Sequence, residues 1–216
     1  MITGFGNLVM HIWIRLAIFL GMGVAFADSM PEIIPDIAAG REKSQVCVSC
    51  HLNDGNSVVP AWPKIAGLPE KYFIEQLQAF KAGDKGGRFN PVMMSFATAL
   101  SEQDMADLAA FYASQKSTPG STPQTFVALG EKTYRGGNRT TGVPACSACH
   151  SPRAEGNIPA GFPSLSGQHP DYIIEQLKAF RSGARANDVN GIMRDISKRM
   201  TDEEIEAVSH YVSGLH

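Results

Sequence analysis

The pattern Cys-x-x-Cys-His occurs twice in this chain, as CVSCH at 47–51 and CSACH at 146–150, and it constrains the fold more than any other feature. Both copies belong to a longer repeat with an offset of about one hundred residues. A period of this length is too long for a solenoid unit and predicts two tandem domains of the same kind. Three further pairs of segments align: 61–67 with 161–167, 68–83 with 168–183, and 100–112 with 200–212.

The repeated segments have the spacing of helices. Tyr72, Leu77 and Phe80 would share one helix face, as would their counterparts one hundred positions later. Ser101 and Thr201 each precede an acidic residue by three positions, which is typical of a helix N-terminus. No stretch shows the sustained alternation of a half-buried strand. The chain is therefore predicted to be all-α.

The first residues have the pattern of a secretory signal. His11 and Arg15 precede an apolar run that ends before the small-residue site Ala25-Phe26-Ala27. The alternative, a retained anchor, would need about 20 apolar residues. We expect cleavage after Ala27 and export to the periplasm. The predicted organisation is a cleaved signal peptide at 1–27, a first domain at 28–116, a linker at 117–124 and a second domain at 125–216.

Charge and cysteine usage narrow the class of protein further. The formal net charge is −2, with 19 basic and 21 acidic residues and no basic patch or stripe. A nucleic-acid partner would call for such a patch, so none is expected. All four cysteines lie in the two motifs, which leaves none for a separate structural disulfide.

Three chemistries use paired cysteines of this spacing. A zinc site would need four ligands close together, but the two pairs lie in different copies of the repeat. A thioredoxin-like dithiol needs a βαβ context, which is not predicted. Covalent haem c fits, because two thiols bind the porphyrin and the adjacent histidine binds the iron. The predicted groups are Cys47, Cys50 and His51 for one haem, and Cys146, Cys149 and His150 for the other.

The sixth iron ligand is predicted to be a methionine in each copy, because His/Met ligation is typical of electron-transfer haems. Met200 aligns with Leu100 and is interpreted as a packing residue, which leaves Met193 in the second copy. Its counterpart is Met93, with the adjacent Met94 as the alternative. The three histidines that are neither in the leader nor in a motif all fall in the second copy, and His169 is expected at the surface.

On these motifs, the chain resembles tandem class I cytochromes c, and more narrowly the dihaem cytochrome c4 family. The resemblance covers the predicted mature chain and implies two cytochrome c domains, each wrapped around one covalently bound haem c. It also implies that Pro63 and Pro163 offer their carbonyls to the two ligand histidines. A glycine contact between the first and last helices of each domain is implied too. The residues in matching places are Gly40, Gly130, Phe111 and Tyr211.

The resemblance further implies a function. Family members are periplasmic carriers that pass single electrons to membrane-bound oxidases, so no catalysis is expected. The donor would be a quinol-oxidising complex or a dehydrogenase, and we expect a monomer, with loose association at the membrane surface left open. Two alternatives stay open: a cytochrome subunit of a periplasmic dehydrogenase complex, and a dihaem peroxidase-type enzyme with one accessible iron.

Overall fold

The computed structural model describes residues 32–216. The described residues from Ile33 to His216 form one compact unit, and the predicted signal peptide lies outside the described residues. No helix within 32–216 combines the length and the apolar composition that a membrane crossing requires.

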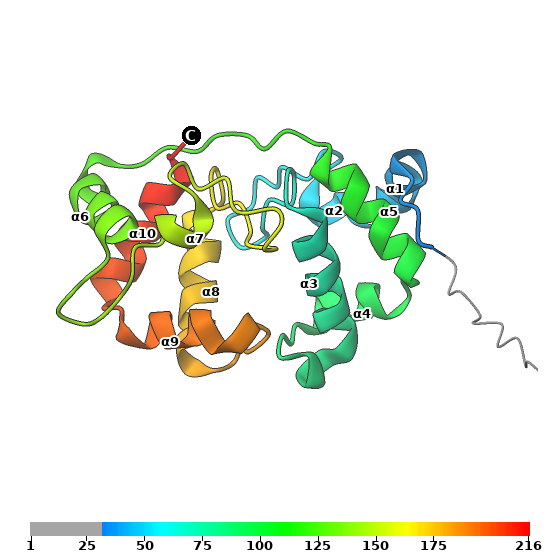
Figure 1. Cartoon of the computed structure of the whole chain (residues 1–216). Coiled ribbons are helices and arrows are strands. Elements are labelled where there is room, and N and C mark those ends of the chain that lie inside the picture. Colours follow the sequence, from blue (N-terminus) through cyan, green and yellow to red (C-terminus); the bar gives the residue numbers. More distant parts are fainter. Residues whose placement is uncertain (1–31) are drawn as a thin grey trace, which may run out of the picture. The chain divides into compact units, whose positions relative to one another are not determined.

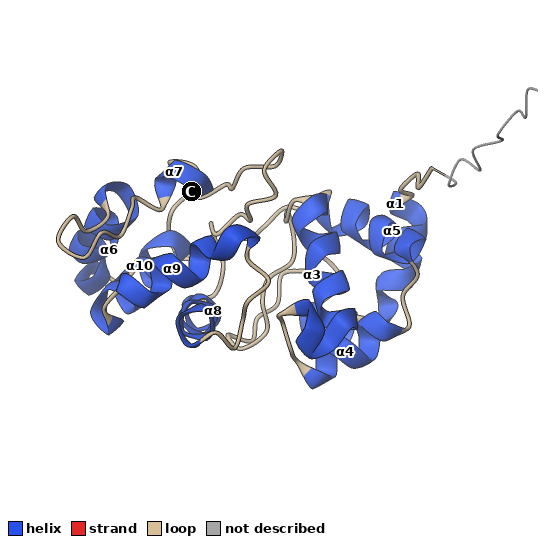
Figure 2. Ribbon diagram, turned by 60° about the horizontal axis from the view of Figure 1, so that its bottom comes forward, coloured by secondary structure: helices blue, strands red, loops and turns tan. Residues whose placement is uncertain are grey.

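Helices account for the regular structure of the unit Ile33–His216 (Figures 1 and 2). Among the described residues the only β-type pairings are isolated bridges, so the all-α prediction is confirmed. The first half contains α1 (Ile37–Lys43), η1 (Ser44–Val46), α2 (Val48–His51), α3 (Glu70–Ala82), η2 (Gly83–Gly86), α4 (Pro91–Thr98) and α5 (Glu102–Ala113). The second half contains α6 (Gln124–Gly136), α7 (Ser147–His150), α8 (Pro170–Ser182), η3 (Val189–Gly191), α9 (Ile192–Arg199) and α10 (Asp202–Ser213).

Each half encloses a hydrophobic core of its own. The first core gathers apolar side chains of α3, α4 and α5, and the second gathers those of α6, α8 and α10. Met105 and Met200 are 1% and 6% exposed and belong to the first and second cores, which agrees with the interpretation of Met200 as a packing residue. Two separate cores on a duplicated helical pattern give two domains of the same kind.

The first and last helices of each domain cross at a glycine, as the family resemblance implied. A Cβ atom at Gly40 of α1 would lie 2.8 Å from the Cβ atom of Phe111 on α5. At Gly130 of α6 the equivalent distance to the Cβ atom of Tyr211 on α10 is 2.5 Å. Both approaches are closer than carbon atoms tolerate, so only glycine allows the two helix backbones to pack this tightly.

Both predicted N-caps are present. The Ser101 hydroxyl accepts the Asp104 amide at 3.1 Å, and the Asp104 carboxylate accepts the Ser101 amide at 2.9 Å. Thr201 and Glu204 repeat this exchange at 3.2 and 2.9 Å. These capping boxes satisfy backbone donors that would otherwise be free, and they fix where α5 and α10 begin.

The segment between α5 and α6 has no helix from residue 114 to 123, and α6 begins at Gln124, the last residue of the predicted linker. Figure 1 shows this segment running from α5 to α6, and hydrogen bonds join it to both domains. The Thr118 amide donates to Asn56 Oδ1 at 2.8 Å, and the Gly120 amide donates to the Ser213 carbonyl at 3.1 Å. The segment is therefore fixed to both domains by hydrogen bonds and is not a freely flexible linker.

Candidate haem sites

In the first domain the Cys-x-x-Cys-His motif forms the short helix α2, which ends at the histidine. The His51 side chain is 7% exposed, and its Nδ1 atom lies 2.9 Å from the carbonyl oxygen of Pro63. That carbonyl requires a proton on Nδ1, which leaves the Nε2 lone pair free for a metal. Burial lowers the pKa of His51, against the opposing effect of the Pro63 carbonyl, so the ring is neutral at pH 7.

The second domain repeats this geometry in α7. The His150 Nδ1 atom lies 3.0 Å from the carbonyl oxygen of Pro163, and burial again lowers the histidine pKa. The Tyr134 hydroxyl adds a bond that the first domain lacks, because it donates to the Ser151 carbonyl at 2.6 Å. Both copies therefore place a buried, neutral imidazole whose orientation is held by a backbone carbonyl.

The candidate methionines lie in the same cavity as the two histidines. Met93 on α4 and Met193 on α9 line this cavity and pack against the first and second hydrophobic cores. Met94 is not among the lining residues, and its sulfur lies beside Gly83 instead. The side-chain directions thus favour Met93 over Met94 at the first site.

The cysteine thiols do not have the properties of a reactive dithiol. Burial raises the pKa of Cys146 to about 11 and also raises that of Cys47. Redox-active thiols instead have lowered pKa values, because the thiolate is the reactive form. Both pairs lie on the wall of the cavity that the histidines line, where a group bound through thioethers would enter the apolar interior.

Two arginines that sequence reasoning missed also line this cavity. Arg88, after η2, and Arg185, after α8, pair as an isolated antiparallel bridge between the two domains. Their guanidinium groups are buried, and each lies 4.4 Å from an aromatic ring of its own domain, Phe80 or Phe180. Neither has a carboxylate within ion-pair distance among the residues that the structure describes.

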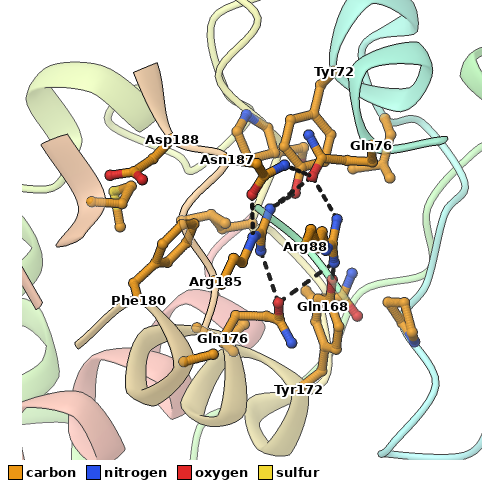
Figure 3. A pocket seen from close by; sticks show the side chains of 18 of the residues that line it. Tyr72, Gln76, Arg88, Gln168, Tyr172, Gln176, Phe180, Arg185, Asn187 and Asp188 are labelled. Atoms are coloured by element: carbon orange, nitrogen blue, oxygen red, sulfur yellow. Dashed lines mark hydrogen bonds between the residues drawn. The ribbon is translucent and has the colours of Figure 1, made fainter. Parts of the chain in front are cut away.

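Neutral acceptors from both domains surround the two guanidinium groups (Figure 3). Arg88 donates to Gln76 Oε1 at 2.6 Å and to the Tyr172 hydroxyl of the second domain at 2.5 Å. Arg185 reaches in the opposite direction and donates to the Tyr72 hydroxyl at 3.1 Å and to Gln76 Oε1 at 2.9 Å. Although burial alone would raise it, the pKa of Tyr72 is lowered by the charges of Arg185 and Arg88.

These residues fit a haem group in each domain. Apolar walls suit the faces of a porphyrin, and a buried guanidinium pair requires an anionic counter-charge. Haem carries two propionate carboxylates, which would supply that charge near Arg88 and Arg185. Part of this cluster was visible as identical Tyr and Gln residues in the repeat, but the arginines stand at different offsets and gave no such signal.

His169 corrects a prediction. We expected it at the surface, but it is half-buried, and its Nε2 atom lies 2.8 Å from the carbonyl oxygen of Ser57 in the first domain. Its neighbour Gln168, which is 7% exposed, bonds the backbone of Lys64. Both residues therefore belong to the contact between the domains.

Two helical domains, each with a Cys-x-x-Cys-His helix and an apolar cavity, define a two-domain c-type cytochrome. The family model for cytochrome c matches residues 37–116 and 127–216. The chain is 48% identical over 188 residues to cytochrome c4 of Azotobacter vinelandii, which covers 84% of this chain and 90% of that protein. The chain belongs to the cytochrome c4 family.

Two more relatives extend the comparison. The crystal structure of reduced recombinant cytochrome c4 from Pseudomonas stutzeri matches with a TM-score of 0.82 at 43% identity, over 85% of this chain and all of that one. A protein of Thiomonas intermedia named thiosulfate dehydrogenase electron acceptor is 35% identical over 82% of this chain and 81% of its own length. The protein is thus a dihaem electron-transfer protein, with haem c bound covalently through Cys47 and Cys50 and through Cys146 and Cys149.

Proposed function

We propose that this protein is a periplasmic carrier of single electrons in a respiratory chain, with a membrane-bound terminal oxidase as its acceptor. The observation that carries the proposal is the equivalent placement of one buried histidine and one methionine along the cavity in both domains. Two firmly ligated irons suit outer-sphere electron transfer and leave no coordination position for a substrate.

The proposal assigns a role to each site residue. His51 and Met93 would hold the iron of the first haem, and His150 and Met193 would hold that of the second. A haem bound at each site would supply the reversible one-electron change of its iron. The carbonyls of Pro63 and Pro163 hold the two imidazole rings in one orientation and increase their basicity as ligands.

The rest of the chain would hold these histidine and methionine side chains in place in both oxidation states. Each domain core packs against its methionine, and α2 or α7 ends at the histidine that lines the same cavity. Little rearrangement then accompanies each transfer, and apolar walls limit the access of water to the iron.

The predicted leader and domains complete the proposal. Cleavage of 1–27 would deliver a mature chain to the periplasm, where it would fold as a first domain at 28–116, a linker at 117–124 and a second domain at 125–216. We propose a monomer that accepts electrons from a quinol-oxidising complex or a dehydrogenase.

The test is addition of carbon monoxide to the dithionite-reduced protein, followed by visible absorption spectroscopy. A carrier with two six-coordinate irons keeps its spectrum, because the gas must displace a methionine. If one haem binds the gas readily in the unaltered protein, that iron is open, and the dihaem peroxidase-type alternative replaces the carrier. Peroxidase turnover of the isolated protein would then be the next measurement.

A second candidate function is supported by a specific relative. The resemblance to the thiosulfate dehydrogenase electron acceptor favours a cytochrome subunit that serves a periplasmic dehydrogenase. Gel filtration of the native periplasmic fraction separates the two possibilities. A free carrier elutes as a single chain, no larger than expected from the 23.3 kDa of the full sequence and its two haems. A subunit elutes together with a dehydrogenase activity.

A further inference from the structure

The two domains hold the start of their methionine helices by different means. In the first domain the side chain of Asn90 caps α4 and accepts the Met93 amide at 3.0 Å, with Pro91 at the first helical position. In the second domain α9 follows Gly191, whose φ is 71°, and no side chain occupies the cap position. The Ile192 amide donates to the Val189 carbonyl, but the Arg194 amide needs a partner from elsewhere.

Asp188 supplies that partner from three residues further upstream. Its Oδ2 atom accepts the Arg194 amide at 2.9 Å, and its Oδ1 atom accepts Arg194 Nε at 2.7 Å. The Asp188 side chain is 3% exposed, whereas that of Arg194 is 36% exposed. One buried carboxylate thus holds both the backbone and the side chain of the residue that follows Met193.

Asp188 lies in the haem cavity rather than on the outer surface. It lines the same cavity as Met193 and Ile192, and Figure 3 shows it among the lining side chains, on the side of the view away from Arg88. A carboxylate that is buried without a partner is costly, so the bond to Arg194 also fixes the direction of Asp188. The segment from 188 to 194 is thereby closed into a loop that carries Met193 near its end.

We propose that Asp188 and Arg194 form a clamp that positions Met193 against the second haem iron. This inference rests on the proposed function, because it takes Met193 as the ligand. The clamp is specific to one site. The first domain has Met94 at the position of Arg194, and there the neutral side chain of Asn90, not a carboxylate, accepts a backbone amide at the start of the methionine helix. Asp188 and Arg194 are positioning residues, and neither binds the iron.

The test compares variants of the full haem-loaded protein. Asp188→Ala removes both bonds, leaves the Arg194 amide without its acceptor and releases the loop. We expect the fraction of second-site iron without its methionine to rise about tenfold, the change that about 1.4 kcal/mol produces. Carbon monoxide should then bind one haem of the two, and the ferric iron–sulfur absorption band should lose intensity. Asp188→Asn, which keeps an oxygen for the Arg194 amide, should recover most of the band.

Two further variants serve as controls for the effect of Asp188→Ala on carbon monoxide binding. Asp195→Ala breaks the exposed pair with Arg199 on the same helix and should leave both haems closed. Asn90→Ala removes the equivalent support in the first domain and should open the other haem. The unaltered haem in each molecule reports whether the fold is intact.

The Met193→Ala spectrum is the reference that separates two kinds of failure. If Met193→Ala itself leaves the protein closed to carbon monoxide, the ligand assignment in the proposed function is wrong. If Met193→Ala opens one haem but Asp188→Ala opens neither, or opens both, the ligand assignment stands and the clamp is overturned. Agreement between the Asp188→Ala and Met193→Ala spectra supports the clamp.

Discussion

At the scale of single residues, the adjacent methionines of the first domain differ in direction. Met93 lines the haem cavity and packs against the first core, whereas the Met94 sulfur would lie 3.3 Å from a Cβ atom at Gly83. Side chains three or four positions apart share a helix face, but neighbours point about 100° apart, so α4 can present only one of the two to the iron. The geometry favours Met93.

The residue-scale prediction compares the two methionines directly. Met93→Ala should allow carbon monoxide to bind the first haem, because alanine leaves the sixth coordination position without a ligand. Met94→Ala changes the same atoms one position later and should leave both haems closed. The visible spectrum of each reduced variant under carbon monoxide is the measurement. An open haem in Met94→Ala with a closed one in Met93→Ala would reverse the assignment.

A charged contact of the first domain, which the second domain lacks, has a predictable pH dependence. Lys43 Nζ lies 2.7 Å from Asp104 Oδ1 and 2.5 Å from Asp107 Oδ2. Lys43 is the largest cause that lowers the pKa of Asp104, followed by Ser101. Burial alone would raise the pKa of Asp107. The hydrogen bonds from Lys43, the Asp36 amide and Gln103 outweigh burial, so the pKa of Asp107 is lowered as well.

At the scale of elements, this contact joins α1 to α5, and Lys43→Met should weaken it. A carboxyl whose pKa is lowered by folding adds stability above its unfolded value of about 3.9, and that stability is lost as the pH falls through the folded pKa. We expect the variant to lose about 1 kcal/mol at pH 7, since Lys43 is partly exposed. The difference from the unaltered protein should shrink as the pH falls below about 4.

Urea unfolding at pH 7 and at pH 3 measures this difference. Lys132→Met, at an exposed position of α6, is the matched control and should change stability little at either pH. A loss of the same size at both pH values would mean that Lys43 contributes through packing of its aliphatic stem instead of its charge.

The same scale shows which parts of the structure the sequence could predict. Helical spacing and the two N-cap patterns are local signals, and they located α3, α5, α8 and α10. The arginine pair could not be found in this way. Arg88 stands five positions after Gly83, but Arg185 stands two after Gly183, so a fixed offset aligns Arg88 with Asp188. Because the two copies differ in spacing here, aligning them does not match Arg88 with Arg185. The two arginines come together only when the domains pack.

At the scale of the whole described unit, the contact between domains reaches the first haem site. Gln168 Oε1 accepts the Lys64 amide at 2.9 Å, and Gln168 Nε2 donates to the Lys64 carbonyl at 2.7 Å. Lys64 directly follows Pro63, whose carbonyl holds His51. The support runs in one direction only, because Leu68 occupies the place of Gln168 in the first copy. A residue of the second domain therefore steadies the histidine loop of the first.

Gln168→Ala should expose this dependence. The substitution removes two hydrogen bonds from the half-buried backbone of Lys64, which costs about 1 to 3 kcal/mol in total. Hydrogen exchange at the Lys64 amide should then accelerate at least about tenfold, because exchange follows the free energy of local opening. Gln103→Ala, which breaks bonds within the first domain alone, is the control and should leave this amide unchanged. Equal protection of the Lys64 amide in both variants would show that the loop is held by its own domain and that each haem site is built independently of its neighbour.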